Sequence, residues 1–244
     1  MNNYKLIIQY DGTDYAGWQI QNNAVTIQQT ILDAVKVITK EEVNLIGSGR
    51  TDSGVHAFGQ VANFKTELNL DLAKFAYSLN SILPREISIK NIEQVPESFH
   101  ARFDAKRRSY FYLFAHGKSP FYYKYSWRYP NILNYNFNEL NKMSKVMLGE
   151  HDFTSFSRKN SDTENRVCII SEIWWRKGED FSTFFITANR FLHGMVRTVV
   201  GTLLKAAENN YNENYLVDIL NKKDREEADE SVPARGLFLF KVRY

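Results

Sequence analysis

The chain has 244 residues, a length that suits one large domain or two domains of roughly 100–150 residues each. Hydrophobic residues make up 43% and charged residues 24% of the chain, which is ordinary for a globular protein that builds its core without disulfides or a structural metal. The net charge of +3 is compatible with a nucleic-acid partner without requiring one, and no apolar run approaches the ~20 residues that span a bilayer.

The chain begins with a predicted strand, a loop and a predicted helix. Residues 4–10 alternate apolar and polar side chains, which is typical of a strand with one buried face. A polar loop punctuated by glycines follows over residues 11–19. Thr26 and Gln29 then have the spacing of a capping box, and apolar residues recur at helical spacing over 27–38.

Residues 60–64 predict a second strand, and Asp71 is placed to cap a helix over residues 72–82 that Pro84 ends. This succession of helix and strand resembles half of a ferredoxin-like layout. The second half of the chain predicts a similar set of elements without a clear sequence repeat: strands over 109–114, 166–176, 181–188 and 237–242, and helices over 140–148 and 191–207. We therefore expect an α+β protein of two subdomains, 1–104 and 105–244.

The chain contains one cysteine, Cys168, within the apolar run 167–170. We interpret it as a small buried hydrophobe rather than a catalytic thiol, because nothing adjacent in sequence would lower its pKa. The five histidines have no zinc-binding spacing, and the sequence contains neither a phosphate-binding P-loop nor a dinucleotide fingerprint. The sequence therefore predicts neither a metal site nor a cofactor site.

The most informative stretch is the polar cluster that glycines bracket over residues 47–57. Arg50 and Asp52 are two positions apart, so in an extended chain they project to the same side. A neighbouring cation favours the ionised carboxylate that a nucleophile requires. From residue chemistry alone, the cluster is equally compatible with a surface turn whose ion pair contributes about 0–1 kcal/mol.

Two basic segments lie in the second half. In the predicted helix 191–207, a face with basic side chains and glycines is formed by Arg190, His193, Gly194, Arg197, Gly201 and Lys205. Such a face can lie against a phosphate backbone, against another helix or simply in solvent. Residues 152–166 contain three further cations and predict either a mobile substrate-binding loop or a solvated one.

Six segments, taken in order, resemble the tRNA pseudouridine synthase A (TruA) family. They are Tyr10–Thr13 with Gly17–Gln19, Gly49–Ala57 with Gly59–Val61, Phe99–Phe103, Asp152–Phe156, Phe191–Arg197, and Gly236–Leu239 with Tyr244. The resemblance runs from about Tyr4 to Tyr244. It implies a fold of two related ferredoxin-like or RRM-like subdomains, with mainly antiparallel sheets packed by helices and an active-site cleft between them.

The resemblance also implies roles for individual residues. Asp52 matches the catalytic nucleophile, and Arg50 matches the arginine that pairs with it and helps hold the flipped nucleotide. Tyr110 matches the tyrosine that contacts the target uracil, although Ser109 and Phe111 stand where the family often has arginines. Arg197 matches a position near the active-site cleft, so it is our choice among the basic residues of its segment.

The implied activity is isomerisation of uridine to pseudouridine at positions 38, 39 and 40 of the tRNA anticodon stem-loop, without metal or cofactor. The implied assembly is a homodimer that binds tRNA. We expect a cytoplasmic location, because residues 1–5 lack the basic-then-apolar layout of a signal peptide. The 14 Tyr, 17 Phe and 4 Trp fit either RNA bases stacked on aromatic rings or an aromatic core. The alternatives are a non-catalytic RNA-binding protein on the same fold and a metal-dependent RNA nuclease, for which the sequence lacks carboxylate clusters.

Overall fold

The computed structural model describes residues 1–159 and 164–244. The chain forms two compact units, the first comprising Met1–Lys106 with Phe238–Tyr244 and the second comprising Arg107–Leu237. The sequence predicts a division between residues 104 and 105, with all later residues in the second subdomain. The terminal segment groups instead with the first unit, because its strand pairs there.

The first unit is built on a sheet in the order β4-β1-β3-β10, with the short β2 also pairing with β3. Its strands are β1 (Asn2–Tyr10), β2 (Ile46–Gly47), β3 (His56–Thr66), β4 (Ile87–Val95) and β10 (Leu237–Arg243). All of these pairs are antiparallel except β3 with β10, where Phe238 lies opposite His56. The predicted alternation in β1 is confirmed, because Tyr4, Leu6 and Ile8 are fully buried.

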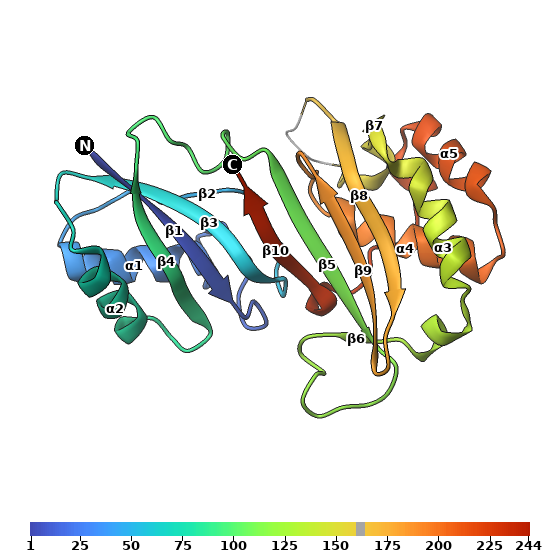
Figure 1. Ribbon diagram of the computed structural model, residues 1–244, viewed down its shortest axis with the longest axis horizontal. Coiled ribbons are helices and arrows are strands. Elements are labelled where there is room, and N and C mark those ends of the chain that lie inside the picture. The colour runs from blue at the N-terminus through green and yellow to red at the C-terminus, as the bar shows by residue number, and fades with distance from the viewer. Residues whose placement is uncertain (160–163) are drawn as a thin grey trace. The chain divides into compact units, whose positions relative to one another are not determined.

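Two helices lie beside this sheet (Figure 1), α1 (Ile27–Thr39) and α2 (Leu72–Ile82). Both predicted N-caps are confirmed: Thr26 accepts a hydrogen bond from the Gln29 amide, and Asp71 accepts one from the Lys74 amide. Such caps satisfy amide groups that have no partner within the helix. The ring of Phe75 in α2 lies 6.0 Å from that of Phe64 in β3 and so joins the helix to the sheet.

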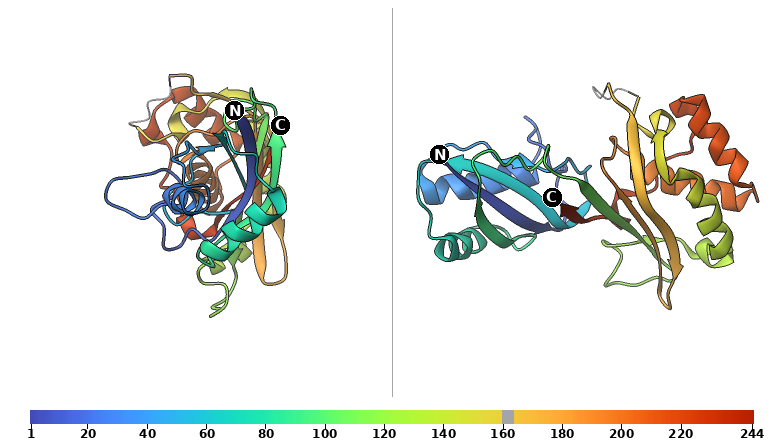
Figure 2. Two further views of the ribbon diagram at one scale, coloured as in Figure 1. Left: turned by 90° about the vertical axis from the view of Figure 1, so that its left-hand side faces the viewer. Right: turned by 45° about the horizontal axis from the view of Figure 1, so that its top comes forward.

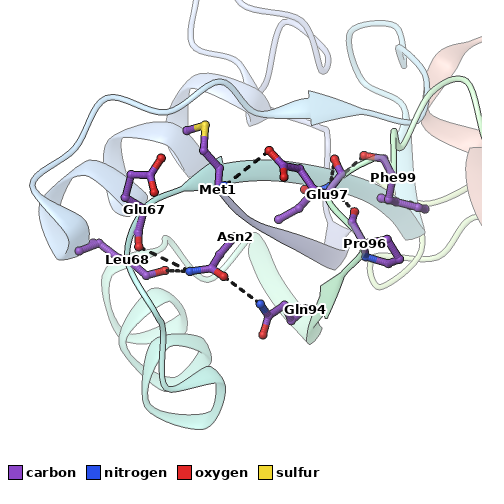
Figure 3. A network of polar contacts seen from close by, with 9 residues as sticks. Met1, Asn2, Glu67, Leu68, Gln94, Pro96, Glu97 and Phe99 are labelled. Carbon is purple, nitrogen blue, oxygen red and sulfur yellow. Dashed lines mark hydrogen bonds and ion pairs between the residues drawn. The ribbon is translucent and has the colours of Figure 1, made fainter.

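The beginning of β1 is tied to neighbouring segments of the first unit by side-chain hydrogen bonds (Figure 3). Asn2 donates to the Leu68 carbonyl and accepts from Gln94. One position further on, the buried Asn3 donates to the Phe99 carbonyl at 2.9 Å and accepts from Asn63 of β3, also at 2.9 Å. The strand and the segment after β4 are therefore joined through side chains as well as through the backbone ladder.

The second unit has a sheet in the order β5-β9-β8-β7, with the short β6 pairing with β5. Its strands are β5 (Arg107–Ala115), β6 (Trp127–Arg128), β7 (Gly149–Asp152), β8 (Val167–Lys177) and β9 (Phe181–Ala188). The pairs β5–β9, β8–β9 and β7–β8 are antiparallel. Strands packed by helices in both units confirm the predicted α+β class.

Three helices lie on one side of this second sheet in both views (Figures 1 and 2): α3 (Phe137–Ser144), α4 (Met195–Glu208) and α5 (Glu213–Lys222). The buried indole of Trp175 in β8 donates to the Ser144 hydroxyl at the end of α3. Single 3₁₀ turns cover Pro130–Asn134, Lys145–Met147, Thr154–Phe156, Arg225–Glu227 and Ala234–Gly236. Within the described residues, no helix is long and apolar enough to cross a membrane.

The amide of Asn63 holds together three segments of the first unit. It donates to Asn3 and accepts from the Ala101 amide at 2.9 Å, and Asn3, Asn63 and Ala101 are all buried. We expect Asn63→Ala to lower the free energy of unfolding by about 1–3 kcal/mol, because it leaves a buried N–H without its acceptor. Urea denaturation measures this, and Asn44→Ala at an exposed position is the control; equal stability of the two variants would contradict the assigned role.

Cys168 is fully buried, and burial raises the pKa of its thiol to about 11. At pH 8 roughly one thiol in a thousand is then ionised, and only the thiolate is nucleophilic. We expect a disulfide reagent to leave the native protein unlabelled at pH 8 and to modify one thiol per chain in urea. Rapid labelling of the native protein would contradict the buried-hydrophobe interpretation.

Candidate active site

Asp52 lies half-buried in the loop between β2 and β3, and the backbone on both sides of it is held in place. The Thr51 carbonyl accepts a hydrogen bond from the Trp18 amide at 3.1 Å, and the Thr51 hydroxyl is 2.8 Å from the hydroxyl of Tyr10. The Asp52 carbonyl in turn accepts from the Val55 amide at 3.1 Å. The carboxylate is therefore presented by a defined turn.

The glycine-punctuated loop 11–19 packs against this turn backbone to backbone. Gly17 has a φ of +92°, and a Cβ built on it would lie 2.5 Å from the Thr51 carbonyl oxygen. A Cβ on Gly12 would lie 2.1 Å from the Val55 oxygen. Real Cβ atoms do not approach backbone this closely, and an L side chain rarely adopts this φ. Glycine is required at both positions to bring the two loops together.

His56, at the start of β3, links the same two loops to the terminal strand. Its Nδ1 lies 3.1 Å from both the Gly12 amide and Asp11 Oδ1. The two contacts need different protonation states, because Nδ1 accepts from an amide only when it carries no proton. The ring is 1% exposed and stacks on Phe238 of β10 at 4.7 Å.

Two buried polar side chains hold the beginning of the Asp52 loop. The Ser48 hydroxyl donates to Gln60 Oε1 at 2.6 Å, and Gln60 Nε2 donates to the Gly49 carbonyl at 2.9 Å. The Ser48 amide donates to the Val61 carbonyl. Sequence reasoning placed Gln60 within the family-like segments and Ser48 within the glycine-bracketed cluster 47–57, without assigning either a role. The structure gives them the support of the backbone that leads to Arg50 and Asp52.

Tyr15 of loop 11–19 is hydrogen-bonded to the segment that follows Asp52. Its carbonyl accepts from the Ser53 hydroxyl at 3.1 Å, and its side chain is buried. Burial, together with the carboxylates of Glu86, Asp14 and Asp11, raises the pKa of the Tyr15 phenol. The phenol therefore stays neutral beside the Asp52 turn.

The predicted partner of Asp52, Arg50, has an exposed side chain. Its Nε donates to Gln19 Oε1 at 3.2 Å, so the arginine also joins the Asp52 loop to loop 11–19. The pairing of Arg50 with Asp52 that the sequence motif implies stays a prediction.

The candidate base-contacting tyrosine, Tyr110, lies in β5 of the second unit opposite Ile186 of β9. It is 8% exposed, and its ring meets that of Phe191 edge-on at 5.1 Å. Tyr112, two residues further on, is fully buried and donates to the Pro233 carbonyl at 2.7 Å. Burial raises the pKa of Tyr112 far above its usual range despite the nearby Arg197 and Arg235.

The predicted basic helix face is wrong at its beginning. Helix α4 starts at Met195, because Gly194 has a φ of +74° and the Met195 amide donates to the Leu192 carbonyl in a preceding turn. Arg190 and His193 therefore do not lie on the helix.

The middle of that face is covered by the chain itself. A Cβ on Gly201 would lie 2.0 Å from the Glu230 carbonyl oxygen. Arg197 Nε donates to the Val232 carbonyl at 2.7 Å, and the Val232 amide donates back to the Arg197 carbonyl. The observed contacts show Arg197 holding the 230–232 segment against α4. Lys205, further along, is exposed.

The segment after β7 has a buried start and a polar continuation. Phe153 and Phe156 are fully buried, and Asp152 accepts from the amide and hydroxyl of Thr154. Burial alone would raise the pKa of Asp152, but these hydrogen bonds and Lys223 hold the pKa below its usual range. The predicted loop of 157–166 lies partly outside the described residues, at 160–163.

Within the described parts of the chain, no group of three or more His, Cys, Asp or Glu side chains is arranged to hold a metal ion.

The chain matches a family described as "tRNA pseudouridine synthase" over residues 6–104 and 143–244. This match covers well over half of the chain, which therefore belongs to the tRNA pseudouridine synthase family.

Similar proteins named "tRNA pseudouridine synthase A" occur in Thermoanaerobacter sp. (42% identical), Caldicellulosiruptor saccharolyticus (40%) and Bacteroides thetaiotaomicron (39%). Each comparison covers 100% of this chain, and it covers 100%, 100% and 91% of the respective relative. The family expected from the six sequence segments is confirmed. A solved structure, "Crystal Structure of a Cbf5-Nop10-Gar1 Complex", aligns over 82% of this chain and 44% of its own, with 14% identity and a TM-score of 0.36, too weak a likeness to argue from.

The contact between loop 11–19 and the Asp52 turn can be tested with one methyl group. We expect Gly17→Ala to lower the rate of the reaction proposed below at least tenfold, because the new Cβ would push on the Thr51 carbonyl and displace Asp52. Gly149→Ala is the matched control, since Gly149 has a similar φ of +89° but nothing lies within 4 Å of its added Cβ. Single-turnover rates measure the effect, and equal rates for the two variants would show that the close approach is unimportant.

Proposed function

We propose that this chain isomerises uridine to pseudouridine in tRNA with Asp52 as the nucleophile. The observation that carries the proposal is a half-buried carboxylate on a turn pinned by Trp18, Tyr10 and Val55, in a chain of the tRNA pseudouridine synthase family. A residue that must attack one atom of a bound nucleotide has to be positioned closely. A binding protein would have no use for a fixed carboxylate beside the phosphates of RNA.

The reaction balances within the substrate itself. The bond between uracil N1 and ribose C1′ breaks, the base turns, and C5 forms a new bond to C1′. The hydrogen on C5 leaves as a proton and N1 gains one, so nothing is oxidised and no group enters from outside. The chemistry therefore calls for no cofactor.

Asp52 would act as a covalent catalyst once the uridine has left its stack, a step that costs a few kcal/mol. It could add to C6 of the uracil or trap C1′ of the ribose, and both routes need the ionised carboxylate. Arg50, two residues before it, would favour that ionised form and then contact the substrate.

We assign substrate contacts to two further residues. Tyr110 would contact the target uracil and assist removal of the C5 proton. Its ring is fixed edge-on against Phe191, which limits the orientations that the phenol can adopt. For Arg197 we keep the proposed role in substrate binding, but the bond of its Nε to Val232 makes positioning of the 230–232 segment part of that role.

We further propose that the substrate region is the tRNA anticodon stem-loop at positions 38, 39 and 40, as the family resemblance implies. The same resemblance supports a homodimer. Because the proposed substrate is tRNA, we place the reaction in the cytoplasm. Pairing two chains would double the net charge of +3 presented to the RNA.

The proposal is tested by converting the carboxylate to an amide of the same shape. We expect Asp52→Asn to reduce pseudouridine formation roughly a thousandfold or more, because the amide is not a nucleophile. Unmodified tRNA transcripts are incubated without cofactor, and pseudouridine is mapped by carbodiimide primer extension. Asp33→Asn, an exposed carboxylate on α1, is the matched control and should retain activity.

Full turnover by Asp52→Asn would remove the nucleophile assignment. Tight tRNA binding by the wild-type protein without any pseudouridine would instead favour a non-catalytic RNA-binding protein.

A further inference from the structure

The loop that connects β5 to β6 exposes large aromatic side chains. Phe121 is 79% exposed and Tyr123 is 62% exposed, although burying such rings is favourable. Exposed apolar groups that gather in one place usually mark a binding surface. The family match covers residues 6–104 and 143–244, so this loop lies outside it.

The loop is a defined turn. The ring of Tyr122 packs edge-on against Phe181 at 4.9 Å. The Tyr122 carbonyl accepts hydrogen bonds from the Tyr125 amide at 3.0 Å and from the Ser126 hydroxyl at 2.8 Å, and Ser126 is buried. Tyr122 thus anchors the turn, and the two exposed rings stand on either side of it in the chain.

The loop and the short β6 that follows it carry charges of one sign. Residues 116–129 contain Lys118, Lys124 and Arg128 and no Asp or Glu. Two acidic residues, Glu179 and Asp180 of the β8–β9 turn, lie beside the loop, because their backbone carbonyls accept hydrogen bonds from the side chain and the amide of His116. The three cations of residues 116–129 outnumber these two carboxylates.

We propose that this loop binds unpaired nucleotides of RNA, with bases stacked on Phe121 and Tyr123 and phosphates near Lys118 and Arg128. Aromatic rings beside cationic side chains match the two parts of a single-stranded nucleotide, the base and the phosphate. That the RNA is tRNA rests on the proposed function. A second copy of the chain fits less well, because a two-fold interface here would bring the cations of both copies together.

The experiment measures binding of unmodified tRNA by filter retention. The double variant Phe121→Ala/Tyr123→Ala should raise the Kd roughly fivefold or more, in keeping with the loss of base stacking. Phe121→Trp/Tyr123→Phe should bind like the wild type, because both rings are kept. Tyr77→Ala removes an equally exposed ring, 76% exposed on α2, and should leave the Kd unchanged.

An unchanged Kd in the double alanine variant would overturn the proposal. A shift of that variant to a smaller species in size-exclusion chromatography would also overturn it, in favour of an interface between copies. Pseudouridine formation by the wild-type protein is scored separately. Its absence would refute the proposed function, whereas a binding defect of the loop variant would still support an RNA-binding surface.

Discussion

The arrangement around Asp52 depends on one steric constraint, the approach of two backbones with no side chain between them. Gly12 and Gly17 leave no room for a Cβ against Val55 and Thr51. Because the two backbones approach so closely, the Trp18 amide donates a hydrogen bond to the Thr51 carbonyl and the Arg50 side chain donates one to Gln19. The loop that carries the proposed nucleophile is thereby as well defined as a strand, although it has no ladder of its own.

Buried polar side chains extend that order into the sheet of the first unit. Gln60 and Asn63, four and seven residues after the start of β3, each bind backbone groups of a neighbouring segment. Within the described residues, every buried side-chain nitrogen and oxygen has a hydrogen-bond partner. Since an unpaired buried polar group costs more than a lost contact, these side chains favour one arrangement of the loops over its alternatives.

Periodicity and capping chemistry predicted β1, α1, α2 and β9 nearly to the residue, because their signals are local. Strand β4 was missed because its register against β1 shifts between Ile89 and Asn91, which breaks the alternation of buried residues. Asp52 was identified by resemblance to the family, because residue chemistry alone did not distinguish a nucleophile from the carboxylate of a surface turn. The contact between Tyr10 and Thr51 joins residues 41 positions apart, and no local pattern encodes it.

The parallel pairing of β10 with β3 bears on the order in which the protein folds. His56 stacks on Phe238, so one support of the Asp52 turn comes from a residue that follows the entire second unit in the sequence. Contacts of such long separation form late, since the chain entropy of closing the loop must be overcome first. During synthesis, the edge of β3 that pairs with β10 would stay unpaired until residues 107–237 have been synthesised. The support of the Asp52 turn by His56 and Phe238 would therefore be complete only after β10 has paired with β3.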